Sequence, residues 1–302
     1  MTALRSLRDA LLIARFQLAR AVRTRSALAL CLLYLLGSTG ATYVFTRILL
    51  QIENETARVL KVPIVERPGA MLDTLRERGD LANILEPLVG REDLVGWALE
   101  QPILTIVHFW FALGVLPFLA VAVGAESVAP DARDRSLRFE LVRTGRLELI
   151  AGRFLGQGVL LLVATVFATL GTWAVAMGAM VEQPAGLQAT TLLASAPRLW
   201  LWSLPFLGLG VACSQLTSTV NFARSLALGA AVGTWILFGV TKTDWAQGQP
   251  YFGALLEPLL PQTYVLDLWG PGWAWAGSGA ILALLGFVAA LVTLPIFARR
   301  NL

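Results

Sequence analysis

Residues 102–125 read PILTIVHFWFALGVLPFLAVAVGA and contain no Asp, Glu, Lys or Arg. Residues 126–153 follow directly and read ESVAPDARDRSLRFELVRTGRLELIAGR, where charges of both signs alternate with apolar side chains. An α-helix needs about 20 apolar residues to cross a hydrocarbon layer about 30 Å thick. The first stretch is therefore long and apolar enough to span a membrane, and the second is too polar to do so.

The whole chain shares this apolar character. Of its 302 residues, 56% are hydrophobic and 15% are charged, and the mean hydropathy is +0.67. A soluble chain carries about 25% charged residues. The apolar residues come in blocks of membrane-spanning length, without the alternating ten-residue segments of a β-barrel. The composition therefore predicts an all-α, polytopic membrane protein.

The hydropathy pattern predicts one membrane domain over residues 1–302. Six transmembrane helices are expected at residues 26–50, 102–125, 154–181, 192–213, 225–241 and 273–297. Residues 1–25 form an amphipathic leader that is expected to lie in the membrane interface. Residues 51–101 form an extracytoplasmic insert, residues 126–153 a cytoplasmic loop, and residues 242–272 an outer segment with many aromatic residues.

The distribution of arginine orients these helices. With six spans, the leader, the 126–153 loop, a short link at residues 214–224 and the C-terminal end share one side of the membrane, where basic residues outnumber acidic ones. Basic segments stay on the cytoplasmic side, so both termini are expected to be cytoplasmic. Indole rings favour the headgroup level. Seven tryptophans are expected at the outer boundary: Trp97, Trp200, Trp202, Trp245, Trp269, Trp273 and Trp275.

The sequence contains little chemistry of its own. It has no Walker A motif, no Gly-x-Ser-x-Gly elbow, no His-Glu-x-x-His motif and no Cys-x-x-Cys pair. Cys31 and Cys213 fall inside predicted spans and indicate small buried apolar side chains. Once the spans are removed, no basic soluble face remains for nucleic acid. No catalytic, metal-binding or cofactor-binding residue is therefore predicted.

Two features inside the spans admit a functional role. His108, the only histidine, is expected either to pack against hydrogen-bonding neighbours or to contact a substrate. Small residues four positions apart, at Gly37 and Ala41 and at Gly229 and Gly233, allow helices to approach closely, either within the chain or at a subunit interface. The central thirds of the spans contain no Asp or Glu, which counts against an ion-coupled carrier.

The 126–153 loop is longer than a connection requires, because links between helices usually have 2–8 residues. A solvated hairpin is one interpretation of its charges. However, its apolar residues are too many for a free loop: Leu137, Phe139, Leu141, Val142, Leu147, Leu149 and Ile150. The loop is therefore expected to dock on a cytoplasmic partner.

The same loop carries an ordered set of motifs. These are Gly124-Ala-Glu126, Ser136-Leu-Arg-Phe-Glu-Leu141, Thr144-Gly-Arg146 and Gly152-Arg153. The set resembles ABC-2 type permeases, the membrane subunits of ATP-binding-cassette transporters, and in particular the subgroup of the nitrous-oxide-reductase maturation permease. That family usually has a glycine before the position of Ser136 and a lysine at that of Arg153, so the match is incomplete there. The resemblance covers nearly the whole chain, in the order of leader, spans and inserts.

The resemblance implies a mechanism. Two permease subunits, expected to be a homodimer, pair in the inner membrane of a bacterium or archaeon, and two copies of a separate ATPase subunit bind beneath them. ATP and Mg²⁺ belong to the ATPase, and no cofactor is expected on this chain. Residues 250–272 are expected to form short re-entrant helices, and export is implied because the family consists mostly of exporters. The residues expected to couple to the ATPase are Glu126, Arg133, Arg135, Arg138, Glu140, Arg143, Arg146, Glu148 and Arg153.

Two other functions stay open on the sequence. An ATP-independent channel or carrier would move its substrate without nucleotide. A membrane enzyme acting on lipid would need clustered catalytic groups, and four acidic residues near the outer surface form no recognised arrangement: Glu182, Asp244, Glu257 and Asp267. The 51–101 insert, which is more acidic than basic, is expected either to cap the spans or to meet an extracytoplasmic partner.

Overall fold

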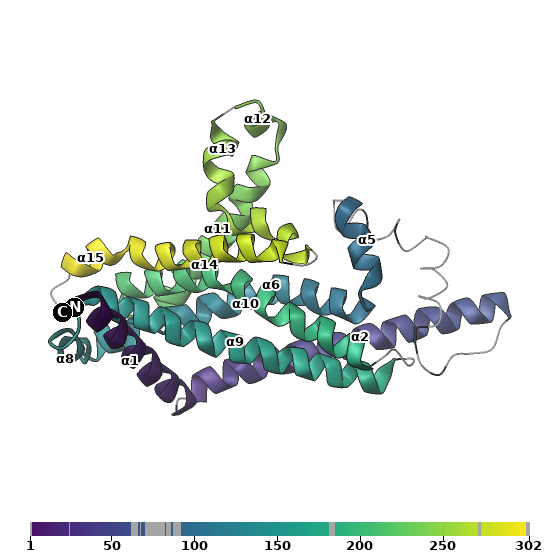
Figure 1. The fold of residues 1–302 in the computed structure, drawn as a ribbon, viewed down its shortest axis with the longest axis horizontal. Coiled ribbons are helices and arrows are strands. Elements are labelled where there is room, and N and C mark those ends of the chain that lie inside the picture. The colour runs from purple at the N-terminus through teal and green to yellow at the C-terminus, as the bar shows by residue number, and fades with distance from the viewer. Residues whose placement is uncertain are drawn as a thin grey trace.

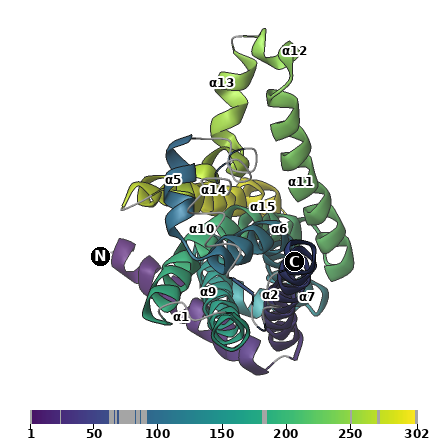
Figure 2. The same ribbon diagram turned by 90° about the vertical axis from the view of Figure 1, so that its right-hand side faces the viewer.

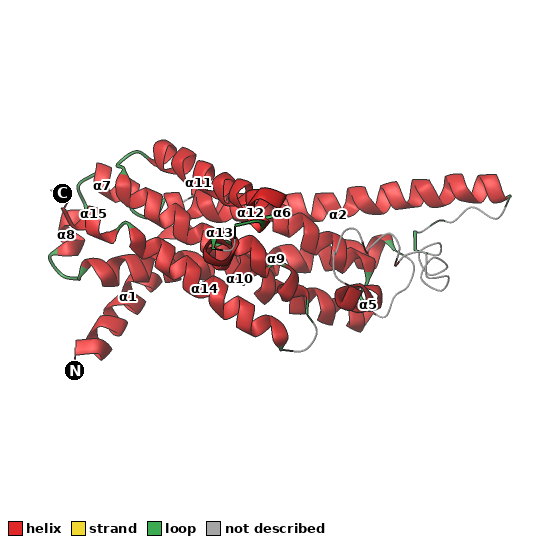
Figure 3. Ribbon diagram, turned by 90° about the horizontal axis from the view of Figure 1, so that it is seen from above, coloured by secondary structure: helices red, strands yellow, loops and turns green. Residues whose placement is uncertain are grey.

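A computed structural model describes residues 2–23, 25–61, 66, 68–69, 82, 86, 92–180, 185–249, 251–270 and 273–299. Every element over these ranges is a helix and no strand occurs among them, so the predicted all-α class is confirmed (Figure 3). Six of the described helices are long and apolar enough to cross a membrane, as predicted: Leu28–Val59, Ile103–Arg133, Arg146–Ala179, Gly186–Leu216, Val220–Thr241 and Trp275–Arg299.

The long helices form a bundle whose axis runs horizontally in Figure 1. The α-helices are α1 (Thr2–Arg23), α2 (Arg25–Leu60), α5 (Glu92–Glu100), α6 (Ile103–Ala125), α7 (Ala129–Arg133), α8 (Leu137–Leu141), α9 (Arg146–Ala179), α10 (Ala185–Leu216), α11 (Val220–Thr241), α12 (Asp244–Gln247), α13 (Phe252–Leu256), α14 (Ala274–Val292) and α15 (Leu294–Arg299). Three short 3₁₀ helices follow α13: η1 (Glu257–Leu259), η2 (Pro261–Tyr264) and η3 (Leu266–Trp269). Both chain ends, α8 and α15 lie at one end of the bundle, and α5 lies toward the other (Figures 1 and 3).

Several helix ends differ from the predicted boundaries. α2 continues to Leu60, beyond the predicted start of the insert at residue 51. α9 begins at Arg146, so residues 146–153, predicted as loop, form its first turns. In both places the polar sequence beyond the apolar block still favours a helix, and loss of hydrophobicity alone does not end one. Within residues 51–101, predicted as an insert, Glu92–Glu100 form α5, and residues 70–81 lie outside the described residues.

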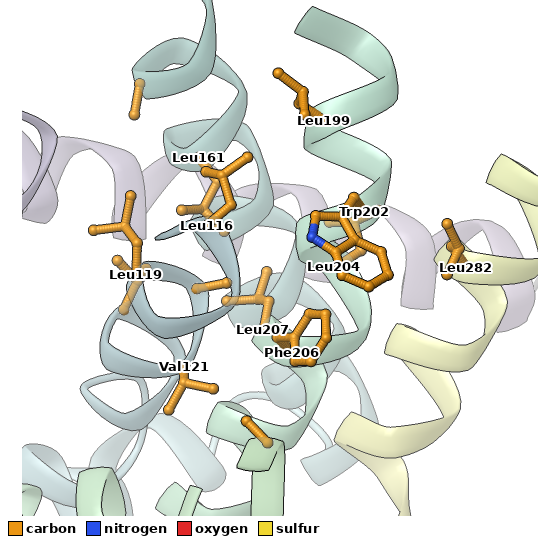
Figure 4. Packing of buried hydrophobic residues seen from close by; sticks show 14 of the residues in the cluster. Leu116, Leu119, Val121, Leu161, Leu199, Trp202, Leu204, Phe206, Leu207 and Leu282 are labelled. Atoms are coloured by element: carbon orange, nitrogen blue, oxygen red, sulfur yellow. The ribbon is translucent and has the colours of Figure 1, made fainter. Parts of the chain in front are cut away.

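α10 occupies the centre of the bundle, where it packs against α6, α9, α11 and α14. Figure 4 shows aliphatic side chains of α6, α9 and α14 around leucines and aromatic rings of α10. Trp202 is fully enclosed there, its ring centroid 5.0 Å from that of Phe206, and its indole N–H donates to the carbonyl of Leu113 at 3.2 Å. Van der Waals packing of such side chains is the main favourable term that holds membrane-spanning helices in this arrangement.

Close contacts through glycine bring α10 against its neighbours. A Cβ atom at Gly124 of α6 would lie 2.6 Å from the carbonyl oxygen of Leu207, and one at Gly210 would lie 2.6 Å from that of Val121. On the other side, a Cβ atom at Gly208 would overlap the backbone of Gly286 in α14. The absence of side chains at these positions allows both helices to lie directly on α10.

The seven tryptophans predicted at the outer boundary differ in burial, and their level relative to a membrane stays a prediction. Trp202 is enclosed among helices, and Trp269 exposes 2% of its surface. Trp200 donates from its indole N–H to the carbonyl of Gly158 at 2.8 Å. Trp245 and Trp273 are exposed. The first three indoles therefore contribute to packing inside the bundle.

α11, α12 and α13 project away from the bundle, as Figure 2 shows from the end of the molecule. α11 contacts α6 and α10, but most of its surface is exposed. The connection that returns from its tip contains η1 and η2, which begin at or next to Pro258 and Pro261. The other two prolines of residues 250–272, Pro250 and Pro271, lie outside the described residues. We call residues 220–259 the projecting arm.

Candidate coupling site

The residues predicted to couple to an ATPase lie at the end of the bundle that holds α8 and α15 (Figure 1). α6 ends at Ala125, and Ser214 at the end of α10 fixes the path that follows. The Ser214 hydroxyl accepts hydrogen bonds from the backbone N–H groups of Val128 and Ala129, at 2.9 and 2.8 Å. It donates one to the carbonyl of Ala125 at 2.8 Å. One buried hydroxyl therefore holds the turn from α6 into α7 against α10.

Arg153 is the centre of this region and is fully buried. Its Nη2 atom lies 2.8 Å from Oδ2 of Asp131 on α7 and 2.6 Å from Oε2 of Glu140 on α8. Its Nη1 atom donates to the backbone carbonyl of Ser127. A buried charge is tolerated only when it is paired and hydrogen-bonded, and this guanidinium is both. Arg153 therefore joins α9 to α7, to α8 and to the end of α6.

Asp131 extends the network to the N-terminal helix. Nη1 of Arg20 donates to both oxygens of the Asp131 carboxylate, at 2.8 and 2.9 Å. Near the other end of α1, the Ser6 hydroxyl donates to Oε1 of Glu148 at 2.8 Å. Asp131 thus bridges an arginine from α1 and the central arginine from α9. Polar contacts near both ends of α1, at Ser6 and Arg20, therefore hold this helix against the region around Arg153.

Small residues bring α1 against α9. A Cβ atom at Gly152 would lie 2.6 Å from the carbonyl oxygen of Ala10, and one at Gly156 would lie 3.0 Å from that of Ala14. The two backbones approach this closely only because neither glycine carries a side chain. The leucine face of α1, with Leu11 among its members, is exposed instead. The helix predicted for the leader is present, and its place in the membrane interface stays a prediction.

Two further contacts join the region to the C-terminal half. Glu126, which follows the last residue of α6, binds Arg224 of α11. Arg146, at the start of α9, donates from Nη1 to the carbonyl of Phe297 on α15 at 2.6 Å, and its guanidinium lies 5.5 Å from the centroid of the same ring. Five of the predicted coupling residues therefore bind groups on other helices: Glu126, Glu140, Arg146, Glu148 and Arg153.

The other four predicted coupling residues are exposed: Arg133, Arg135, Arg138 and Arg143. Between the last two lie Phe139 and Val142, which expose 78% and 84% of their surface. We call Arg138, Phe139, Val142 and Arg143 the coupling face. It is an apolar pair flanked by two cations, held on a short helix that the buried Arg153 network anchors.

The residues predicted for a pathway or a subunit interface lie elsewhere. His108 is buried among hydroxyl groups: its Nδ1 atom lies 3.0 Å from Oγ of Ser38 and 3.1 Å from Oγ1 of Thr172, and its Nε2 atom lies 3.3 Å from Oγ1 of Thr169. These partners belong to α2 and α9, so the imidazole links three helices. The arrangement corresponds to the packed, hydrogen-bonded alternative for His108.

The small-residue pairs have different surroundings. A Cβ atom at Gly37 would lie 3.6 Å from the ring of Phe111, an ordinary contact, and Ala41 follows one turn later on α2. Gly229 and Gly233 on α11 have no atom near enough to meet an added Cβ atom. The first pair therefore borders a helix of the same chain, and the second faces open space on the projecting arm.

Two of the four carboxylates considered for a lipid enzyme, Glu257 and Asp267, have individual partners. Glu257 accepts a hydrogen bond from Lys242 at 2.7 Å, and Asp267 accepts one from Ser278 at 3.0 Å. Glu182 lies outside the described residues. Within the described ranges, no group of three His, Cys, Asp or Glu side chains is placed to hold a metal ion.

A comparison with known protein families identifies the family of this chain. The family described as ABC-2 family transporter protein matches residues 11–261, which include α2, α6, α9, α10, α11 and the whole coupling region. A comparison with curated proteins found no match. The chain is therefore a multi-pass membrane protein of the ABC-2 transporter family.

Proposed function

We propose that this chain is the permease subunit of an ATP-driven exporter, moved by a separate ATPase that docks on the coupling face. The observation that carries the proposal is the combination of an exposed apolar pair and a buried anchor beneath it. Phe139 and Val142 face outward, while Glu140, on the same short helix, binds the fully buried Arg153. A partner that pushes on this helix pushes directly on α9.

The contacts around Arg153 spread that displacement to the other helices. Arg153 connects α7 and α8 to α9, Ser214 connects the start of α7 to α10, and Arg224 connects the end of α6 to α11. The ATPase would supply ATP and Mg²⁺ binding, and two copies would serve two permease subunits. Ion pairs and hydrogen bonds of this kind keep the short helices and the spans moving as one body.

We further propose that the second permease subunit is another copy of this chain and that it covers the projecting arm. α11 presents Gly229 and Gly233 to open space, and Phe222, Val232 and Ile236 are exposed on the same helix. Small residues beside large apolar ones suit close helix packing in lipid. The leader would lie in the cytoplasmic leaflet of an inner membrane, with both termini in the cytosol. The 51–101 insert would face outward, toward an extracytoplasmic partner.

Affinity purification and reconstitution test this proposal. The full chain, tagged and purified in mild detergent, is expected to recover a small ATPase, which mass spectrometry identifies. Both are then reconstituted in liposomes, and ATP hydrolysis is measured with the wild-type permease and with Val142→Ser. Val59→Ser is the matched control, because Val59 has a similar exposure, 81%, and lies at the far end of α2.

The proposal requires that the permease stimulate hydrolysis, that Val142→Ser abolish most of the stimulation, and that Val59→Ser leave it intact. If no ATPase binds the full chain, or if substrate crosses liposomes at the same rate without nucleotide, a channel or carrier that works without ATP replaces it. Crosslinking between cysteines placed at Gly229 in two copies tests the dimer separately. Absence of crosslinked dimers in native membranes contradicts the proposed interface.

A further inference from the structure

Arg198 has no counter-ion among the residues that the structure describes. It lies on α10, about 20 Å along the helix from its N-terminal end at 1.5 Å per residue. Within the part of the chain that the structure describes, Arg198 makes no hydrogen bond and no ion pair, and its Nε atom is buried without an acceptor. Charged side chains within membrane-spanning helices are costly and commonly serve a ligand or ion pathway. The acceptor for this guanidinium therefore has to come from outside the described residues.

Two indole rings hold the guanidinium in place. The Cζ atom of Arg198 lies 5.7 Å from the ring centroid of Trp97 and 5.4 Å from that of Trp275. Such cation–π contacts orient the side chain and offset part of the cost of burying its charge. These contacts involve the π-faces of the indole rings and supply no hydrogen-bond acceptor of the kind that an oxygen atom offers. The N–H groups at the edge of the guanidinium remain available.

A second buried donor belongs to a ring beside one of these indoles. Among the described residues, the indole Nε1 atom of Trp269 is buried and has no hydrogen-bond partner. The ring is fixed by other aromatic side chains, its centroid 4.1 Å from that of Phe109 and 5.7 Å from that of Trp97. A buried donor without an acceptor is destabilising, so two such donors near one cavity indicate a ligand that supplies the acceptors.

Arg198 and Trp269 both line a cavity of about 260 Å³ between α5, α6, α10 and η3. Thr105 and Thr191 contribute hydroxyl groups to its wall, with their Oγ1 atoms 3.3 Å apart. No Asp or Glu lines the cavity among the residues that the structure describes. The volume approaches the lower end of small-molecule sites, about 300 Å³, and suits a compact polar group.

We propose that this cavity binds an oxyanion, a phosphate or a carboxylate, through the guanidinium of Arg198 and the indole N–H of Trp269. The oxyanion neutralises the charge of Arg198 and accepts hydrogen bonds from both donors. A water molecule accepts the hydrogen bonds but does not neutralise the charge. The aromatic side chains around it accommodate the apolar body that carries the anionic group. Two sources offer this chemistry: the headgroup of an anionic lipid and a soluble anion. The inference is independent of ATPase docking, so either proposal stands if the other fails.

Thermal unfolding of the purified full chain in nanodiscs distinguishes these sources. The wild-type chain is compared in phosphatidylcholine discs, in phosphatidylcholine discs with saturating inorganic phosphate or acetate, and in discs containing phosphatidylglycerol. Binding raises the melting temperature, by about 4 °C or more at saturation. A rise with the soluble anions assigns the site to a soluble ligand, and a rise only with phosphatidylglycerol assigns it to a lipid headgroup.

Four variants localise the effect. Arg198→Gln removes the charge, and Trp269→Phe removes only the N–H donor, so each is expected to lose at least half of the rise. Arg143→Gln and Trp245→Phe are the matched controls, since both residues are exposed and remote from the cavity, and each is expected to keep the full rise. If Arg198→Gln fails to fold, Trp269→Phe decides alone. A wild-type chain that responds to neither anion, or a rise that survives in both cavity variants, overturns the proposal.

Discussion

Arg153 of α9 and Asp131 of α7 form an ion pair with 2.8 Å between Nη2 and Oδ2, and both side chains are buried. Arg20 of α1 binds the same carboxylate. Three helices that are distant in sequence therefore meet at one aspartate. The pair places a fixed electrostatic centre directly beneath the exposed coupling face.

Arg153→Gln is expected to destabilise the protein strongly. The substitution leaves Asp131 and Glu140 without their shared cation, and breaking a buried pair costs about 3–5 kcal/mol. The melting temperature of the purified chain is the measurement. Arg143→Gln, which removes an exposed arginine of the same segment, is expected to change stability by no more than about 0.5 kcal/mol. Equal melting temperatures for the two variants would show that Arg153 is not an anchor.

Arg153→Lys keeps the positive charge at this position and changes only the geometry of the charged group. The family usually carries lysine here, but a single ammonium group lacks the two separate nitrogen atoms with which Arg153 reaches Ser127 and the two carboxylates. We expect a melting temperature between those of the wild type and Arg153→Gln. A value as low as that of Arg153→Gln would mean that the guanidinium shape matters more than the charge.

Phe139→Ser is expected to leave the fold intact and to weaken ATPase binding. Phe139 exposes 78% of its surface, so its removal costs the isolated chain little. At an interface, a buried aromatic anchor commonly contributes 2 kcal/mol or more, roughly a thirtyfold loss of affinity. Titration of the purified ATPase against the reconstituted permease measures the loss. Phe167→Ser on α9 is the control, since its ring is also exposed and lies away from the coupling face.

Gly208→Ala is expected to separate α10 from α14. The added Cβ atom would overlap the backbone of Gly286, and backbone atoms cannot move aside as a flexible side chain does. Overpacking of this kind costs about 1–3 kcal/mol. Gly229→Ala is the matched control, because an added Cβ atom there meets nothing within the chain. Melting temperatures compare the two, and a drop confined to Gly229→Ala would contradict the packing described for α10.

Thr172→Val is expected to weaken the contact between α2, α6 and α9. Its hydroxyl lies 3.1 Å from both Ser38 and His108, and its loss leaves these buried polar groups with fewer partners, at about 1–3 kcal/mol. Thr56→Val removes a hydroxyl that bonds only to the carbonyl of Ile52 in its own helix, so we expect little change. If the transport rate per folded molecule falls in Thr172→Val, the polar cluster also contributes to the pathway.

The sequence predicts the helical class and the number of spans because both depend on long apolar blocks that single residues do not alter. Glu126 marks the end of the second span correctly, since α6 ends at Ala125. The start of α9 at Arg146 is not predictable from hydropathy, because the helix extends into a charged segment. Hydropathy reports where lipid contact ends, and backbone hydrogen bonding continues beyond that point.

The candidate site was predictable in position but not in detail. Arg138 and Arg153 look alike in sequence, yet one is exposed and the other fully buried. The difference in burial between these two arginines depends on partners that are distant along the chain. Arg153 binds Asp131, which in turn binds Arg20, 111 residues away from Asp131. Arg198 was not predicted as a site residue, although a cation within a membrane span indicates a ligand or ion pathway as a carboxylate does.

The central position of α10 has a consequence for biogenesis. α1, α2 and α9 contact one another and are complete before α10 leaves the ribosome, whereas the largest contact surface of α6 is with α10. A nascent chain that stops after the third span therefore holds α6 in lipid without its main partner. Insertion of the fourth span is the step that converts a loose set of helices into a protease-resistant unit, and chains truncated before residue 216 should be recognised by membrane quality control.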